Sequence, residues 1–401
     1  MSHRVGIYTP SLSLGGGGEK HALALGAALS RRAEVTFYSR SSVDLEHWGR
    51  YFHLDLAGCR VVQLPGPDIP MRATLRLGMA KERYWAARDR RDYLFLKAQR
   101  PDVFINFAYE SLMPSPVSRA GYVCMFPPAL TRKVGLRQAS ERLARHMGLP
   151  SGSEAVRSYP RIFANSAFTG RWVNRLWGRP VDGYLHPPCD DFLDHEVEKE
   201  RRILSVGRFF PWSSEPHHHK RHDVMIEAFR HMDDLHSQGW ELELIGTVAP
   251  VPQHQAWVEH LQDLAGGAPV RIRTDVSHRE LRLAVAQASL YWHATGFGTD
   301  AEIHPVSQEH FGIAVVEAMG AGAVPIVHGS GGPAEIVQSG RDGYHWSTPD
   351  QLIERSRAVV RNPQLRGQIA QAARRRYLDF SPAAFAAEAE ALLDSILEVP
   401  A

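Results

Sequence analysis

Two carboxylates on either side of an expected helix start are the residues in this sequence most suited to chemistry. Glu309 and Glu317 lie eight residues apart in the stretch EHFGIAVVEAM. A carboxylate only accepts hydrogen bonds, so both suit the hydroxyl groups of a ribose or a hexose. Between them, Phe311, Gly312 and Ile313 are expected to present backbone N–H groups at the positive end of the helix dipole, which favours a diphosphate. The alternative is that Glu309 only offsets the helix dipole and Glu317 only faces solvent.

The elements around these carboxylates are expected to form a parallel sheet. Apolar runs predict strands at 203–207, 241–245, 289–293 and 324–327. Helices are expected between them, one of which begins at a capping box formed by Ser277 and Glu280. Strands that alternate with helices indicate a sheet covered on both faces, with binding groups at the carboxyl ends of its strands.

The N-terminal half repeats this pattern. Strands are expected at 5–8, 34–38, 60–64, 101–106 and 161–164, and a glycine-rich turn at 15–18 precedes a helix at 22–29. A further helix should open at Asn165-Ser166 and close at Gly178. The tract 185–189, with two prolines, is interpreted as a linker. The predicted fold class is therefore α/β, with two doubly wound Rossmann-like domains at 1–187 and 188–379 and a C-terminal helix at 380–401 that returns to the first domain.

Composition excludes several other classes of protein. The chain of 401 residues has three cysteines without CxxC spacing, which indicates neither a disulfide framework nor a zinc site. Its apolar runs are shorter than the roughly 20 residues of a membrane helix, and its start does not resemble a signal peptide, so a cytoplasmic location is expected. The net charge of +2 conceals a split, because 27 basic and 15 acidic residues precede position 191, and 19 and 29 follow.

The stretch EHFGIAVVEAM, followed by GAGAVPIVHGSGGPAEIV, resembles the E-x7-E signature of retaining glycosyltransferase family 4, the group 1 nucleotide-sugar glycosyltransferases of GT-B fold. The resemblance is nearest to bacterial members and to the branch that adds mannose to dolichol-linked oligosaccharide. It implies two facing Rossmann-like domains. It also implies that Glu317 binds the ribose hydroxyls and that Glu309 contacts the hexose hydroxyls.

The resemblance also assigns the groups that bind the donor diphosphate. Arg208 matches a conserved arginine of the family. Because the insert 209–219 widens the usual spacing, Lys220 and its neighbour Arg221 are both candidates for the conserved lysine position, and Lys220 is the assignment made. A forked guanidinium and a point-charge ammonium both suit a diphosphate. The three adjacent histidines at 217–219 are expected to lie in a solvated loop, because they cannot all face one metal ion from a regular element.

Further site residues follow from the family pattern. Gly16 and Gly17 are plausible contacts to the transferred sugar or its phosphate, since glycines bring backbone N–H groups close to an anion. Met125 stands where many relatives carry a histidine near the transferred sugar, which leaves Tyr109 as a local polar alternative. His293 ends an expected strand and is a further candidate site residue. The alternative interpretation is that it is a solvated histidine in an ordinary loop. Thr247 and Val276 are expected to line the nucleoside pocket, because each follows an expected strand of the second sheet.

The implied reaction is hexosyl transfer with retention from a nucleotide-diphosphate sugar, with GDP-mannose favoured by the resemblance. Relatives are thought to use the leaving diphosphate to take the acceptor proton, so Arg208, Lys220 and the helix start after Glu309 would supply electrostatic catalysis. The sequence shows no DxD-like constellation, and neither a metal ion nor another cofactor is expected. The alternatives are a nucleotide-sugar epimerase of the same fold and a sugar-nucleotide binding protein that has lost turnover.

The acceptor is expected to be a glycan, a polyprenyl-linked sugar or a small molecule. Nine basic and three acidic residues lie among aromatic ones at 72–100, and a second basic stretch spans 132–145. Such stretches are typical of peripheral contact with an anionic membrane face or a lipid diphosphate. A solvated helix face is the alternative. Nucleic acid is not expected as a partner, because no nucleic-acid-binding signature accompanies these stretches.

Overall fold

The computed structural model describes residues 2–12, 16–65, 80–130, 152–211 and 218–401, and only the backbone of 80–87. The chain divides into two compact units. Unit 1 comprises Met1–Pro188 and Phe385–Ala401, and unit 2 comprises Cys189–Ala384. The sequence predicts domain boundaries after residues 187 and 379. The division into compact units does not test whether those domains fold separately, so these boundaries stay predictions.

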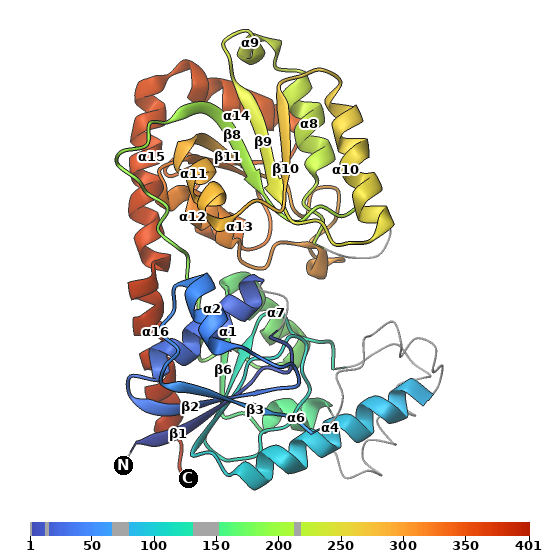
Figure 1. The fold of residues 1–401 in the computed structure, drawn as a ribbon, viewed down its shortest axis with the longest axis vertical. Helices are drawn as coiled ribbons and strands as arrows, with labels where there is room; N and C mark the ends of the chain where they lie inside the picture. The colour runs from blue at the N-terminus through green and yellow to red at the C-terminus, as the bar shows by residue number, and fades with distance from the viewer. Residues whose placement is uncertain (1, 13–15, 66–79, 131–151, 212–217) are drawn as a thin grey trace. The chain divides into compact units, whose positions relative to one another are not determined.

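Unit 1 contains a parallel sheet of seven strands with helices on both of its faces (Figure 1). In sheet order, the strands are β3 (Cys59–Gln63), β2 (Ala33–Ser39), β1 (His3–Tyr8), β4 (Val103–Asn106), β5 (Ala120–Cys124), β6 (Arg161–Ala164) and β7 (Gly183–Tyr184). Besides the C-terminal helix, the helices described in this unit are α1 (Gly17–Leu29), α2 (Leu45–Phe52), α4 (Ala80–Gln99), α6 (Gly152–Arg157) and α7 (Ala167–Trp177). The order of the strands reverses between β1 and β4, where a doubly wound sheet opens its binding crevice.

Unit 2 contains a second parallel sheet, of six strands. In sheet order, these are β10 (Val270–Thr274), β9 (Glu241–Gly246), β8 (Glu200–Val206), β11 (Ala288–His293), β12 (Val324–His328) and β13 (Tyr344–Trp346). The helices are α8 (His222–Arg230), α9 (Asp233–His236), α10 (Pro252–Ala265), α11 (His278–Gln287), α12 (Ile313–Gly320), α13 (Pro333–Ile336), α14 (Pro349–Arg361) and α15 (Pro363–Tyr377), with short 3-10 turns at Pro305–Ser307 and Leu378–Phe380. In this sheet the order reverses between β8 and β11.

The two parallel α/β sheets confirm the predicted fold class. Local signals in the sequence also placed several helix ends. The Ser166 side chain caps α7, and Gly178 ends it with φ 67°. Ser277 and Glu280 form the expected capping box of α11.

The C-terminal helix α16 (Pro382–Leu397) packs on unit 1, as predicted. Its apolar side chains join those of α1 and the sheet in one buried core. Gly121 of β5 allows close packing here, because a Cβ atom on it would lie 2.6 Å from Cδ1 of Ile396. At the helix surface, Asp394 pairs with Arg32 at the end of α1 at 2.7 Å.

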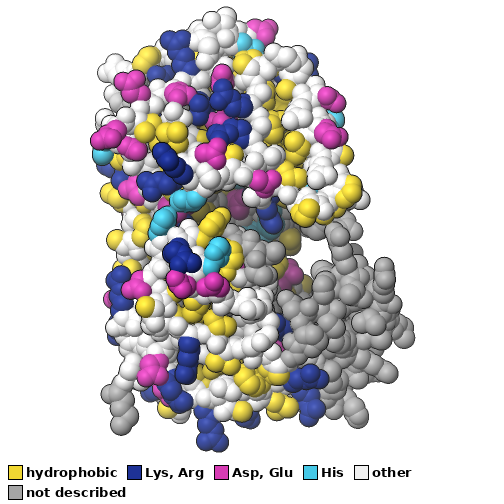
Figure 2. All heavy atoms as spheres, viewed as in Figure 1, with side chains coloured by type: hydrophobic (Ala, Val, Ile, Leu, Met, Phe, Trp, Pro, Cys, Tyr) yellow, Lys and Arg dark blue, Asp and Glu magenta, His cyan; other side chains and the backbone are white. Residues whose placement is uncertain are grey.

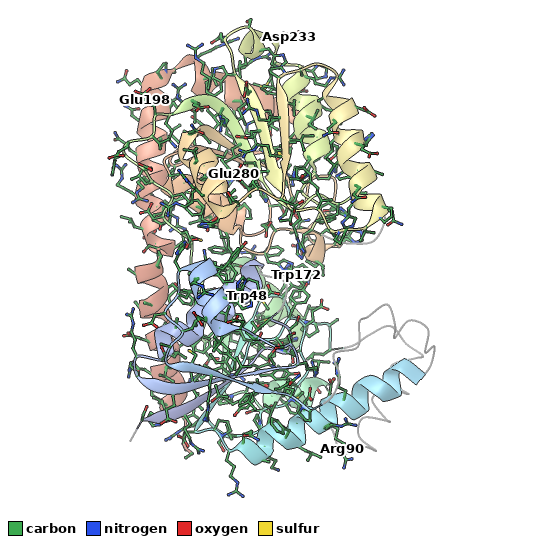
Figure 3. All side chains as sticks on the ribbon, viewed as in Figure 1. Trp48, Arg90, Trp172, Glu198, Asp233 and Glu280 are labelled. Carbon is green, nitrogen blue, oxygen red and sulfur yellow. The ribbon has the colours of Figure 1, made fainter. Side chains whose placement is uncertain are left out.

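Charged side chains of both signs are interspersed over the face drawn in Figure 2. The basic stretch 132–145 and residues 72–79 lie outside the described residues. The rest of the first basic stretch belongs to α4, where Arg90, labelled in Figure 3, is exposed. None of the described helices is both long and apolar enough to cross a lipid bilayer.

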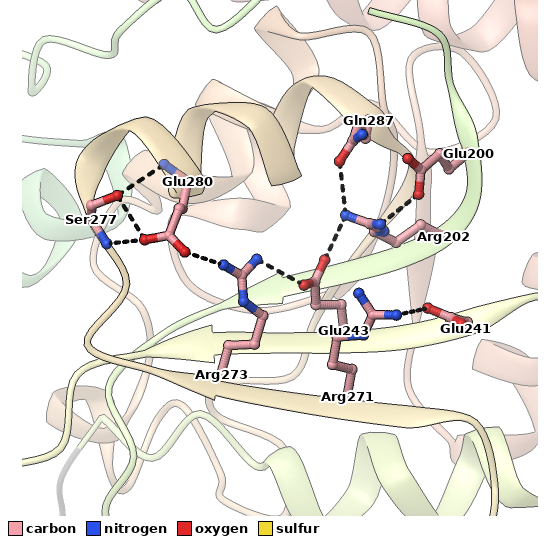
Figure 4. Close-up of polar contacts among 9 residues, drawn as sticks. All are labelled: Glu200, Arg202, Glu241, Glu243, Arg271, Arg273, Ser277, Glu280 and Gln287. Carbon is pink, nitrogen blue, oxygen red and sulfur yellow. Dashed lines mark hydrogen bonds and ion pairs between the residues drawn. The ribbon is translucent and has the colours of Figure 1, made fainter.

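A buried carboxylate ties the strands of unit 2 together (Figure 4). Glu243 of β9 is 1% exposed and lies 2.8 Å from Arg202 of β8 and 3.2 Å from Arg273 of β10. Arg273 also contacts Glu280, the capping residue of α11 that Figure 3 labels, at 2.8 Å. The network therefore fixes the end of β10 and the start of α11, on either side of the predicted nucleoside-binding residue Val276.

Replacing Glu243 with alanine should therefore destabilise unit 2, because Arg202 would lose its buried partner and keep only Gln287 and the half-exposed Glu200. We expect a loss of about 3–5 kcal/mol in the free energy of unfolding, measured by urea denaturation. Glu241→Ala is the matched control on the same strand, since Glu241 pairs with Arg271 where both side chains are exposed. This control should cost at most about 1 kcal/mol. Equal losses in the two variants would contradict the prediction.

Candidate functional site

The conspicuous feature of unit 2 is an ionic cluster at the carboxyl ends of β8 and β11. The Lys220 ammonium, which follows β8, contacts the Glu309 carboxylate, which precedes α12. His293, the last residue of β11, places Nε2 3.8 Å from Oε2 of the same carboxylate. The structure therefore brings together three of the predicted site residues.

The electrostatics of this cluster keep Glu309 ionised. Burial acts to raise the pKa of Glu309, but the Lys220 ammonium and the nearby His293 imidazole hold it well below its usual range. His293 behaves in the opposite way, because burial lowers its pKa despite the nearby carboxylate. The His293 side chain is buried. The alternative of a solvated loop position for His293 is therefore wrong.

The Lys220 side chain packs directly over Gly207 on its way to the cluster. A Cβ atom on Gly207 would lie 2.7 Å from Cγ of Lys220, so the lysine stem requires the space that glycine leaves. The next residue, Arg208, is exposed, and its guanidinium carbon lies 5.9 Å from the centre of the Phe210 ring. The two predicted diphosphate-binding cations thus follow the same strand.

The start of α12 is held by the turn after β12. Gly332 N–H donates to the carbonyl oxygen of Glu309 at 2.7 Å. Phe311 is buried, Gly312 is the N-cap and Ile313 is the first helical residue. The first N–H groups of a helix have no partner within it, so this end can bind an anion.

The remaining predicted residues of unit 2 lie around this helix and along the same sheet edge. Glu317 is inside α12, and its Oε1 accepts a hydrogen bond from the backbone N–H of Asp190 at 3.2 Å. Thr247, after β9, is exposed, and its carbonyl accepts from the Phe209 N–H at 3.0 Å. Val276, after β10, packs against the apolar cluster that includes the first turns of α12.

Unit 1 holds the other predicted contacts at the carboxyl edge of its own sheet. Gly16 is the N-cap of α1, and its N–H donates to the Glu19 carboxylate at 3.0 Å, so in this structure that donor has a partner. Gly17 begins the helix. Met125, after β5, lies beside α1, since a Cβ atom on Gly18 would be 3.4 Å from its sulfur. Tyr109, after β4, is 48% exposed.

His217 lies outside the described residues, but His218 and His219 differ from the expectation of a solvated loop. His218 is half-buried, with its Nδ1 2.7 Å from the carbonyl oxygen of Gln308, and His219 is 5% exposed and packs on Phe210. Sequence reasoning missed these positions because their partners come from distant segments. Within the described part of the chain, no group of side chains is arranged to hold a metal ion.

The sequence did not predict a role for Gln308, which is fully buried beside Glu309. Its amide donates to Oγ1 of Thr299 at 2.9 Å and accepts from Oγ of Ser330 at 2.7 Å. The amide passes next to Gly296, where a Cβ atom would lie 2.1 Å from Oε1 of Gln308. Gln308 therefore connects the loops after β11 and β12 to the segment that carries Glu309.

Comparison with known proteins defines the class. Residues 191–376 match the family described as glycosyl transferases group 1. Unit 2 therefore contains a glycosyl transferase group 1 segment, and the two parallel α/β sheets form a GT-B fold. The matched segment contains Glu309, Glu317, Arg208, Lys220 and His293.

Individual relatives are distant. A "GDP-Man:Man(3)GlcNAc(2)-PP-Dol alpha-1,2-mannosyltransferase" of Xenopus laevis is 28% identical over 186 residues, which cover 43% of this chain and 34% of that protein. The chain spans less than half the length of the curated relatives it matches.

Two solved structures show the same fold over nearly the whole chain. Sucrose-phosphate synthase from Thermosynechococcus elongatus has a TM-score of 0.69 at 14% identity, and covers 99% of this chain and 100% of its own. Alr3699/HepE of Anabaena in complex with UDP and glucose has a TM-score of 0.64 at 15% identity, with 98% and 100% covered.

Gly296→Ala should destabilise unit 2 more than an equivalent change elsewhere. Gly296 has φ 90°, and an added methyl group would also displace the Gln308 amide. Gly340→Ala is the matched control, because Gly340 has φ 84° and open space around it. Backbone strain should cost both variants about 1–2 kcal/mol, and loss of two hydrogen bonds should add about 1–3 kcal/mol for Gly296→Ala alone. Urea denaturation measures the difference, and similar losses would show that Gln308 adapts freely.

Proposed function

We propose that this protein transfers a hexose from a nucleotide-diphosphate sugar to an acceptor, with retention of anomeric configuration. The observation that carries the proposal is the cluster of Lys220, Glu309 and His293 at the start of α12, within the segment matched by the glycosyltransferase family. This cluster joins a cation suited to a phosphate with an ionised carboxylate suited to sugar hydroxyls.

Each group has a distinct role in the proposed donor complex. Arg208, Lys220 and the N–H groups at the start of α12 donate to the diphosphate, and they stabilise the negative charge that develops on it as the glycosidic bond breaks. Glu309 accepts from hexose hydroxyls and Glu317 from ribose hydroxyls. Thr247 and Val276 flank the nucleoside. The leaving diphosphate takes the acceptor proton, so no protein nucleophile takes part.

The donor and the acceptor are proposed from resemblance. A GDP-sugar, with mannose as the hexose, is favoured by the mannosyltransferase relatives. The lipid diphosphate in the name of those relatives favours a polyprenyl-linked glycan as acceptor. Gly16, Gly17, Met125 and Tyr109 are proposed to lie near the transferred sugar or the acceptor. A cytoplasmic enzyme with peripheral membrane contact through 72–100 and 132–145 remains part of this proposal.

Incubation with a panel of GDP- and UDP-sugars, with and without polyprenyl-linked and soluble acceptors, tests the function. We expect turnover only when an acceptor is present, and proton NMR of the product should show the anomeric configuration of the donor. Release of an epimerised sugar without acceptor would identify an epimerase. Binding without turnover of any donor would identify a binding protein, and either result would overturn the proposal.

Glu317→Ala should weaken binding of the nucleotide part of the donor. A hydrogen bond to a charged group contributes about 1.5–3 kcal/mol, so the Kd for the nucleoside diphosphate should rise about 10- to 100-fold. Isothermal titration calorimetry measures this change. Glu227→Ala, an exposed glutamate on α8, is the control and should leave the Kd unchanged. An unchanged Kd for Glu317→Ala would remove Glu317 from the donor site.

A further inference from the structure

His218 is fixed against the backbone that carries Glu309. It lies two residues before Lys220, and its Nδ1 is 2.7 Å from the carbonyl oxygen of Gln308. Its ring meets His310 edge-on, with centroids 4.4 Å apart. The residue that precedes Glu309 and the one that follows it therefore both contact this imidazole.

The contact with Gln308 determines which nitrogen of His218 carries the proton. A carbonyl oxygen only accepts hydrogen bonds, so Nδ1 must donate. Burial lowers the pKa of His218, although the Glu309 carboxylate opposes this effect. The ring is therefore neutral at physiological pH, and Nε2 carries a lone pair and only accepts.

A nitrogen that only accepts hydrogen bonds restricts what His218 can bind. The oxygens of an ionised diphosphate are also acceptors, so Nε2 requires a hydroxyl or N–H donor. His218 interacts electrostatically with Glu309, Lys220 and Arg208, the groups proposed to hold the hexose and the diphosphate. The ribose hydroxyls are assigned to Glu317. The hexose hydroxyls, which are assigned to Glu309, are hydrogen-bond donors at this end of the site.

We propose that Nε2 of His218 accepts a hydrogen bond from a hydroxyl group of the donor hexose, which makes His218 a residue that selects the transferred sugar. The inference rests on the proposed donor site. It adds His218, a residue of the insert 209–219, to that site. The alternative is that the imidazole only holds the Gln308 carbonyl in place.

Two substitutions separate these roles. In His218→Asn, the amide nitrogen can occupy the place of Nδ1 and keep the bond to Gln308, but nothing replaces Nε2. In His218→Gln, the longer amide can reach the place of Nε2. His195→Asn, at an exposed histidine of the same unit, is the matched control. Thermal unfolding should show that the three variants and the wild type have similar stability.

Calorimetric titration with GDP-mannose and with GDP provides the readout. A hydrogen bond between neutral groups is worth about 0.5–1.5 kcal/mol, so the Kd of His218→Asn for GDP-mannose should rise about 3- to 10-fold. His218→Gln should recover part of this loss, and the Kd for GDP should be unchanged in every variant. Wild-type affinity for GDP-mannose in His218→Asn would overturn the proposal, as would an equal loss of affinity for GDP.

Monodeoxy analogues of GDP-mannose identify the hydroxyl. The analogue that lacks the contacted hydroxyl should bind the wild type and His218→Asn with the same Kd, whereas the other analogues should retain the 3- to 10-fold difference. A difference that persists with every analogue would contradict a hexose contact. If the wild type binds GDP but no nucleotide sugar of the donor panel, the proposed function itself fails, and the inference fails with it.

Discussion

The ion pair between Lys220 and Glu309 is the interaction on which the candidate site depends. A carboxylate that is largely removed from water requires a positive partner, and without Lys220 burial would raise the pKa of Glu309. The partners are 89 residues apart in sequence, and they meet because β8 and β11 are neighbours in the sheet. This is the place where the strand order of unit 2 reverses, so the topology itself creates the site.

The backbone around the ion pair is positioned by hydrogen bonds that do not involve the carboxylates. Gln308 joins the loops after β11 and β12, and Gly332 N–H holds the carbonyl of Glu309. Gln308 is fully buried, and breaking its contacts would leave its amide without partners in a region of low dielectric. These hydrogen bonds hold the backbone that carries Glu309, as the proposed electrostatic catalysis requires.

The sequence predicted much of this architecture, because many of its signals are local. The capping box at Ser277, the helix end at Gly178 and the strand at Arg161–Ala164 each depend on a few consecutive residues. Strands β5 and β13 and the helices α14 and α15 were not predicted. The roles of Gln308 and His218 could not be predicted either. The His218 imidazole meets a carbonyl oxygen 90 residues away, and the Gln308 amide bonds to Thr299 and Ser330, which lie on two different loops.

Charge explains why neutral histidines surround this site. The chain after Asp190 carries 19 basic and 29 acidic residues, so the proposed binding of a diphosphate there depends on a few local positive groups. Lys220 is partly neutralised by Glu309, whereas Arg208 and the start of α12 supply the remaining positive potential. Burial lowers the pKa values of His218, His293 and His310, so these rings add no charge. In the proposed donor complex, His218 accepts a hydrogen bond from a hexose hydroxyl while the few cations remain available for the diphosphate.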